Sequence, residues 1–286
     1  MRLPPQLHRR EPDTHKGDYG HLLILGGSPG LTGAMVLAAK AALRAGCGLV
    51  TVGVPSSLNF IFEIKLTEVM SLPLPESRAN SLSEKAFRKV REFSQRVDGI
   101  VLGCGGSRNN STQRFFLRVI ERMEKPLLVD ADGINALASQ IEILKKRKTK
   151  ILILTPHLGE FSRLIGKDIG YIKKKKKELA KSFAFKYNLI LVLKGYRSII
   201  TDGERLFENF TGNPGLATAG SGDVLAGMIG GFLVQGIPPF KAAKLGVYLH
   251  GLAGDLGVKK KSQASLIASD IIEYLPEVIK KLSKPR

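Results

Sequence analysis

Short apolar runs alternate along the chain with longer segments of helical periodicity. The runs are almost entirely apolar, and they cover residues 22–25, 49–54, 99–102, 127–129, 151–154 and 189–193. Continuous apolar runs are typical of strands whose two faces are both covered. Because helical segments separate these strands, the pattern predicts an α/β fold with a central, mostly parallel sheet and helices on both faces.

The last third of the chain has a different pattern. Residues 198–201 and 205–207 flank Asp202-Gly203, which predicts a β-hairpin. From Ser221 onward the pattern predicts three helices, with breaks near 236–239 and 257–262. The polar stretch 73–83 is interpreted as a loop. No linker or internal repeat divides the chain, so we expect residues 1–286 to form a single domain.

Composition excludes several classes of protein. Hydrophobic residues make up 43% of the 286 positions, which is too many for a disordered chain. Two cysteines cannot form a disulfide framework, so we expect a reducing, cytoplasmic environment. No stretch is long enough to span a bilayer, and the first 21 residues lack the apolar segment of a signal peptide.

The net charge of +19 raises the question of a polyanionic partner. The basic residues gather in the runs 145–148, 173–177 and 259–261, and no aromatic residue is interleaved within them as a single-strand binding surface would require. We therefore expect solvated lysines and no nucleic-acid partner. General attraction of anions and an unseen polyanion remain alternatives.

Residues 213–223 contain the most informative motif, because Gly220-Ser221-Gly222-Asp223 leads directly into an apolar helix. Backbone N–H groups at such a helix start form a cradle for anions, and glycine allows phosphate oxygens to approach closely. Asp223 then has two interpretations. It caps the helix, or it takes a proton from a hydroxyl group that attacks phosphorus.

Further candidate residues follow other predicted strands, and their side chains should gather at one edge of the sheet. His157 and Glu160 lie in Thr-Pro-His-Leu-Gly-Glu, where loop hydrogen bonding and helix-start electrostatics are the alternatives to a ligand role. Lys194 is either a phosphate contact or a surface lysine. Asp130 and Asp132 either cap a short helix or bind a ligand.

Two glycine-rich turns, at 26–33 and 103–107, also follow strands. Neither matches the dinucleotide-binding or Walker A pattern. The chain has no Cys/His spacing typical of zinc, and no arrangement that supports a serine nucleophile.

Five motifs in one order make the chain similar to a known family. They lie at 15–21, 26–33, 130–135, 155–161 and 213–223, and this series resembles the ADP-dependent NAD(P)H-hydrate dehydratases of the ribokinase-like superfamily. The resemblance implies dehydration of the S-form of hydrated NADH or NADPH, with ADP as phosphate donor and AMP and phosphate as products. The implied chemistry is phosphorylation of the ring hydroxyl followed by loss of phosphate.

The resemblance also implies roles for individual residues. Asp223 would activate the hydroxyl, the N–H groups around Gly220–Gly222 would hold the phosphoryl group, and Glu160 would organise Mg²⁺ through water. The implied contacts of the hydrated nicotinamide nucleotide are Ala34, Gly105, Gly106, His157 and Asp223. Those of the adenine nucleotide are Lys194, Gly195, Tyr196, Arg197, Ser198, Gly220, Ser221 and Gly222.

One departure and one alternative qualify this resemblance. The family usually has Gly-Pro-Gly-Leu-Gly where this chain has Gly103-Cys104-Gly105-Gly106-Ser107, so a rigid proline is missing and glycine flexibility is kept. Small-molecule kinases of the same superfamily, of the hydroxymethylpyrimidine or thiazole type, are the alternative. His157 and the motif at 15–20 favour the dehydratase. The resemblance further implies a homo-oligomer, often a tetramer, and an NAD(P)HX epimerase on a separate chain.

Overall fold

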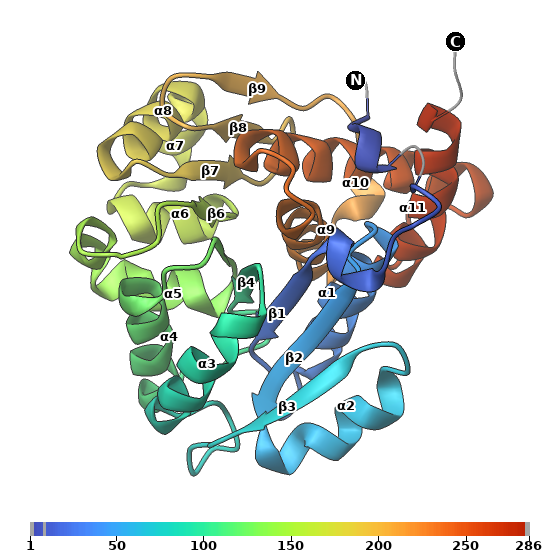
Figure 1. The fold of residues 1–286 in the computed structure, drawn as a ribbon. Helices are drawn as coiled ribbons and strands as arrows, with labels where there is room; N and C mark the ends of the chain where they lie inside the picture. Colours follow the sequence, from blue (N-terminus) through green and yellow to red (C-terminus); the bar gives the residue numbers. More distant parts are fainter. Residues whose placement is uncertain (1–2, 8–9, 284–286) are drawn as a thin grey trace.

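The computed structural model describes residues 3–7 and 10–283, and a nine-stranded sheet lies at its centre (Figure 1). The strand order is β3-β2-β1-β4-β5-β6-β7-β8-β9, parallel from β3 to β7 and antiparallel from β7 to β9. The strands are β1 (His21–Leu25), β2 (Leu49–Pro55), β3 (Met70–Leu74), β4 (Gly99–Leu102), β5 (Leu127–Val129), β6 (Leu152–Leu154), β7 (Ile190–Leu193), β8 (Ile199–Thr201) and β9 (Leu206–Glu208). This confirms the predicted mostly parallel sheet and the hairpin at 198–207.

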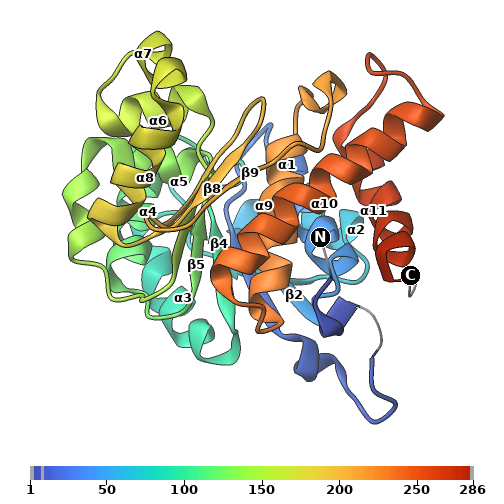
Figure 2. The same cartoon turned by 90° about the horizontal axis from the view of Figure 1, so that it is seen from above.

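Helices cover both faces of the sheet (Figure 2). One layer contains α1 (Thr32–Arg44), α2 (Asn59–Lys65), α9 (Ser221–Val234), α10 (Pro239–Lys260) and α11 (Ala268–Ser283). The other contains α3 (Phe87–Phe93), α4 (Asn110–Arg122), α5 (Asp132–Ser139), α6 (Leu158–Ile165), α7 (Ile169–Lys174) and α8 (Lys176–Tyr187). In β1, Leu22 and Ile24 face the first layer while Leu23 and Leu25 face the second. This double burial explains the continuous apolar runs.

One helix and one strand at the edge of the sheet were not predicted from the sequence. The expected loop 73–83 begins inside β3, and α2 before it was not predicted. Pro73 indicated a break, but β3 is an edge strand, where a proline removes no required hydrogen bond. Helix α4 begins at Asn110, because Asn109 caps it by accepting a hydrogen bond from the Ser111 N–H.

The lysine-rich runs are mostly exposed, as predicted, with two exceptions. Lys176 and Arg147 are half-buried, and both donate hydrogen bonds to backbone carbonyl groups. The expectation that all these cations are solvated was therefore wrong for these two. Separately, none of the helices in residues 3–7 and 10–283 is both long and apolar enough to cross a membrane.

Candidate active site

The polar residues singled out after the strands meet at one edge of the sheet, around a partly buried lysine. Lys194, directly after β7, places its Nζ 2.6 Å from Oδ1 of Asp130, which follows β5. The Thr155 hydroxyl donates to the same oxygen at 2.7 Å. Asp130 is 1% exposed. Lys194 is therefore not a surface lysine, and Asp130 binds this cation instead of capping a helix.

The Lys194 ammonium is surrounded by carboxylates. Burial lowers its pKa, but Asp130, Glu160 and Asp223 together raise the pKa above the ordinary lysine value. The ammonium also lies at the start of α9, since a Cβ added to Gly222 would be 3.3 Å from Nζ. A permanent positive charge thus sits where the motif 213–223 was expected to bind an anion.

The start of α9 has the features expected of an anion cradle. Its N-cap, Gly220, has φ of +85°, and no side chain caps the helix there. The Ser221 N–H donates to the Thr218 carbonyl oxygen at 3.3 Å, whereas within the described residues the N–H groups of Gly222 and Asp223 have no protein acceptor and remain available to a ligand. Within the described residues the Asp223 carboxylate accepts no hydrogen bond from the backbone of its own helix, so the capping interpretation of Asp223 is not realised.

Asp223 lies instead in a cluster with Asp130 and Cys104. Ligand-type atoms of these three side chains all lie within 4.8 Å of one another. Burial, with the Asp130 charge, raises the pKa of Asp223 to about 6, against the opposing effects of the Cys104 thiol and Lys194. Lys194 already neutralises Asp130, so this cluster fits a proton-transfer site better than a cation site.

His157 and Glu160 form a capping box at the start of α6. His157 Nδ1 accepts from the N–H groups of Gly159 and Glu160, at 3.0 and 3.2 Å, and Glu160 Oε2 accepts from the His157 N–H at 2.8 Å. Burial, with Lys194 and Arg163, lowers the pKa of His157. The ring is therefore neutral at pH 7, with its proton on Nε2.

Glu160 is 5% exposed, and burial raises its pKa to about 7. Oε2 is used by the capping box and Oε1 lies 3.4 Å from His157 Nε2. With both oxygens close to protein groups, the carboxylate does not fit direct coordination of Mg²⁺. It fits the expected contact through water, because Mg²⁺ normally keeps several waters.

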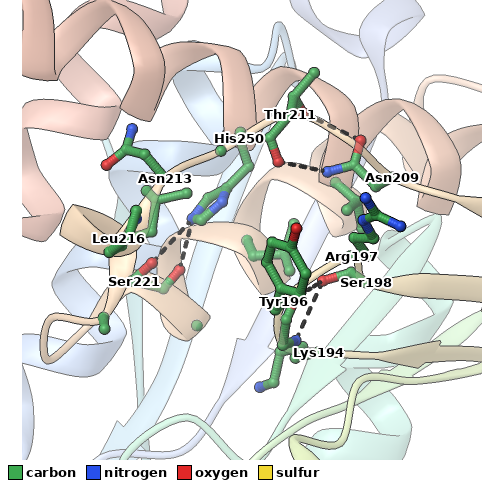
Figure 3. A pocket seen from close by; sticks show the side chains of 18 of the residues that line it. Lys194, Tyr196, Arg197, Ser198, Asn209, Thr211, Asn213, Leu216, Ser221 and His250 are labelled. Carbon is green, nitrogen blue, oxygen red and sulfur yellow. Dashed lines mark hydrogen bonds between the residues drawn. The ribbon is translucent and has the colours of Figure 1, made fainter. Parts of the chain in front are cut away.

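A cavity of about 880 Å³ opens beside this charged cluster (Figure 3). Its lining joins the loop 194–198, the segment 209–218, the start of α9 and the middle of α10. The predicted nucleotide contacts found in the lining are Lys194, Gly195, Tyr196, Arg197, Ser198, Ser221 and Gly222. Gly220 does not line it. Gly220 instead approaches α1, where an added Cβ would lie 2.4 Å from Leu37 Cδ1.

The predicted contacts of the hydrated nucleotide are divided between two places. His157 lines the cavity, whereas Ala34, Gly105, Gly106 and Asp223 do not. Ala34 lies in the first turn of α1, and a Cβ on Gly105 would come within 3.1 Å of its side chain. A Cβ on Gly106 would lie 2.4 Å from Phe116.

The glycines of the loop 103–107 serve close packing rather than flexibility. A Cβ on Gly103, whose φ is +114°, would lie 2.1 Å from the Asp130 carbonyl oxygen. The loop is also tied down by hydrogen bonds from the Ser28 hydroxyl to Gly105 and from the Ser107 N–H to Asp132. Cys104, where the family usually has proline, is completely buried beside Asp223.

His250, which lines the cavity from α10, was not predicted from the sequence. Its Nε2 lies 3.0 Å from the carbonyl oxygen and 3.2 Å from the hydroxyl of Ser221, and burial lowers its pKa to about 4. Figure 3 shows these bonds reaching the start of α9. A single histidine in a long apolar helix was the only signal in the sequence.

The fold and this site together define a ribokinase-like protein. The structure superposes on a ribokinase-like superfamily protein from Enterococcus faecalis with a TM-score of 0.82 and 26% identity, over 98% of this chain and 95% of the other. The family model described as NAD(P)H-hydrate dehydratase matches residues 22–277. The chain belongs to the NAD(P)H-hydrate dehydratase family.

Individual relatives agree with this assignment. A bifunctional NAD(P)H-hydrate repair enzyme from Moorella thermoacetica is 45% identical over 98% of this chain and 53% of its own length. An ADP-dependent (S)-NAD(P)H-hydrate dehydratase from Neisseria meningitidis is 35% identical over 95% of this chain and 88% of its own. The Bacillus subtilis ADP/ATP-dependent enzyme, co-crystallised with ATP/Mg²⁺, is 32% identical with a TM-score of 0.83, covering 96% of this chain and 94% of that one. The chain spans about half the length of several of the curated relatives it matches.

Proposed function

We propose that the chain dehydrates the S-form of hydrated NADH or NADPH to NADH or NADPH, with ADP as phosphate donor and AMP and phosphate as products. The proposal rests chiefly on one observation. Lys194 and the uncapped start of α9 line a cavity large enough for a nucleotide, and Asp223, in the first turn of the same helix, lies in the cluster with Asp130. The similar Neisseria protein, named as ADP-dependent, supports the choice of ADP.

In this proposal Asp223 accepts the proton of the ring hydroxyl as the hydroxyl oxygen attacks the β-phosphorus of ADP. The bond from phosphorus to AMP breaks, and the N–H groups of α9 with Lys194 stabilise the charge on the transferring phosphoryl group. Phosphate then leaves the ring carbon with the C–O bonding electrons, and the neighbouring ring carbon releases a proton to water. The electrons of that C–H bond form the ring double bond, which restores the dihydronicotinamide. Phosphate leaves far more readily than hydroxide, so the phosphoryl transfer makes the elimination possible.

Mg²⁺ is part of the proposal, with Glu160 as its contact through water. A divalent cation would offset the negative charge of the nucleotide phosphates. Because its pKa is about 7, the Glu160 carboxyl group near Lys194 would be protonated below that pH and ionised above it. We further propose that one dehydratase domain extends over residues 1–286, that the protein works in the cytoplasm, and that an epimerase supplies the S-form.

A homo-oligomer, such as a tetramer, is also proposed. The side chains of Phe60 and Ile64 on α2 are 71% and 67% exposed, and Met70 on the edge strand β3 is 44% exposed. Exposed apolar side chains of this size support an interface between subunits. Light scattering coupled to size-exclusion chromatography would measure the mass in solution.

The activity is tested with the purified chain, hydrated NADH, Mg²⁺ and either ADP or ATP, by recovery of NADH absorbance. Recovery that requires a nucleotide supports the proposal, and the absence of recovery with both nucleotides contradicts it. A parallel assay with hydroxymethylpyrimidine and thiazole alcohols tests the kinase alternative. A hydroxyethylthiazole kinase of the same fold is only 16% identical to this chain.

A further inference from the structure

The lysine run 173–177 contains one member whose environment differs from the others. Lys176 is half-buried, whereas the other four lysines are exposed. It is the first residue of α8 and is separated from the end of α7 by one residue, Lys175. A charged amine that is partly removed from water needs compensating contacts, so its partners indicate what it does.

Both partners lie in the loop that lines the cavity. Lys176 Nζ donates hydrogen bonds to the carbonyl oxygens of Tyr196 and Arg197, at 2.9 and 2.8 Å. Burial lowers the pKa of Lys176, while Glu208 opposes this and Lys177 adds to it. The cation thus joins the start of α8 to two consecutive peptide groups of the loop 194–198, about twenty residues away in the sequence.

This loop needs an external support. Arg197 has a φ of +51° and Gly195 a φ of +144°, so the chain turns sharply through conformations that non-glycine residues rarely adopt. Within the described residues, the side-chain hydrogen bonds made inside this loop join Ser198 to Gly195, and Lys194 anchors its first residue to Asp130. The Tyr196 side chain is 87% exposed and so contributes little packing.

The direction of the two carbonyl groups also matters for an anionic ligand. Tyr196, Arg197 and Ser198 line the cavity, and a carbonyl oxygen turned into it would repel phosphate or other negative groups. Lys176 holds the oxygens of Tyr196 and Arg197 toward α8 instead. The lysine therefore acts on the ligand through the loop and does not itself line the cavity.

We propose that Lys176 is a positioning residue that fixes the conformation of the loop 194–198 and thereby sets the affinity of the cavity for ADP. This inference rests on the proposed function of the loop as a nucleotide site. It gives a role to one lysine of the run 173–177, which the sequence alone predicts to be solvated.

The test compares Lys176→Met with Lys173→Met, a matched control from the same run. Lys173 is exposed and shows no hydrogen bond or ion pair in the described part of the chain. We expect the Lys176 variant to raise the Kd and the KM for ADP about tenfold, as the loss of charge-assisted hydrogen bonds would predict, with KM for hydrated NADH and kcat unchanged. The control should match the wild type.

Two further measurements guard against a simple folding defect. Lys176→Arg retains a donor cation and should recover most of the ADP affinity. Hydrogen exchange of peptides covering 194–198, measured without any nucleotide, should be faster in Lys176→Met than in Lys173→Met. Unchanged ADP affinity, or an equal rise in KM for both substrates, would overturn the inference. If the wild-type chain bound no ADP, the proposed function itself would fail, whereas the exchange experiment would still report on the loop.

Discussion

Lys194 and Asp130 form an ion pair of 2.6 Å whose two side chains are 18% and 2% exposed. Breaking a buried pair leaves one charge without compensation, which typically costs about 3–5 kcal/mol. We expect Lys194→Met to lower the free energy of unfolding in urea by about 3 kcal/mol and to weaken ADP binding. The double variant Lys194→Met/Asp130→Asn should recover part of that stability but none of the ADP affinity. Equal stability of the two variants would contradict a buried pair.

Asp223→Asn should abolish recovery of NADH and should also stabilise the protein. The folded-state pKa of about 6 lies above the unfolded value of about 3.9, so the folded chain binds more protons between these pH values. The contribution of Asp223 to stability is therefore greatest at acid pH and is lost as pH rises through 6. At pH 7.5 the ionised carboxylate costs about 2–3 kcal/mol, which asparagine avoids.

Urea unfolding of wild type and Asp223→Asn at pH 7.5 and 4.5 measures this difference, which should shrink at the lower pH. Glu68→Gln, a change at an exposed carboxylate, serves as the control and should alter neither stability nor activity. An active Asp223→Asn variant would remove Asp223 from the role of base.

Cys104 should adjust the pH dependence of the reaction. Burial raises the pKa of its thiol well above the usual value, so the thiol stays protonated and can donate to Asp223. In Cys104→Ala the acid limb of the kcat/KM profile, near pH 6 in the wild type, should move upward by about 0.5–1 pH unit, which corresponds to one hydrogen bond. Cys104→Ser should keep the wild-type profile.

The matched control for Cys104→Ala is Cys47→Ala. Cys47 is equally a buried thiol, but it bonds to the carbonyl groups of Gly20 and Leu49. Both alanine variants should lose about 1 kcal/mol of stability through the cavity they create. A profile that shifts in both variants, or in neither, would show that the Cys104 thiol has no specific effect on the base.

His250 should support the start of α9 in its neutral form. Its folded-state pKa of about 4 is below the unfolded value of about 6.5, so its contribution to stability is present above pH 6.5 and is lost as pH falls toward 4. His250→Phe removes the donor to Ser221 and should raise KM for ADP and cost about 1–2 kcal/mol at pH 7.5. His250→Gln should retain more affinity, and isothermal titration with ADP measures both. Wild-type affinity in His250→Phe would exclude this supporting role.

The sheet and the main motifs could be predicted from the sequence because they depend on local patterns. Continuous apolar runs indicated strands buried on both faces, and the order of motifs indicated the family. The edge unit of α2 and β3 could not be predicted in the same way. Its residues are partly exposed, and Pro73 is compatible with a strand only at the edge of a sheet, a position that neighbouring strands determine.

The candidate site, like the fold, could be predicted from the sequence only in part. The sequence by itself determined which chemical groups the site would contain, because Gly220–Asp223, His157, Glu160 and Lys194 belong to motifs whose backbone and side-chain chemistry is local. Tertiary structure alone decided which of them touch. The pairing of Lys194 with Asp130, the contact of Cys104 with Asp223 and the reach of Lys176 to the loop 194–198 join distant segments. Burial then shifts the pKa values, because the cost of removing charge from water depends on packing that no local pattern encodes.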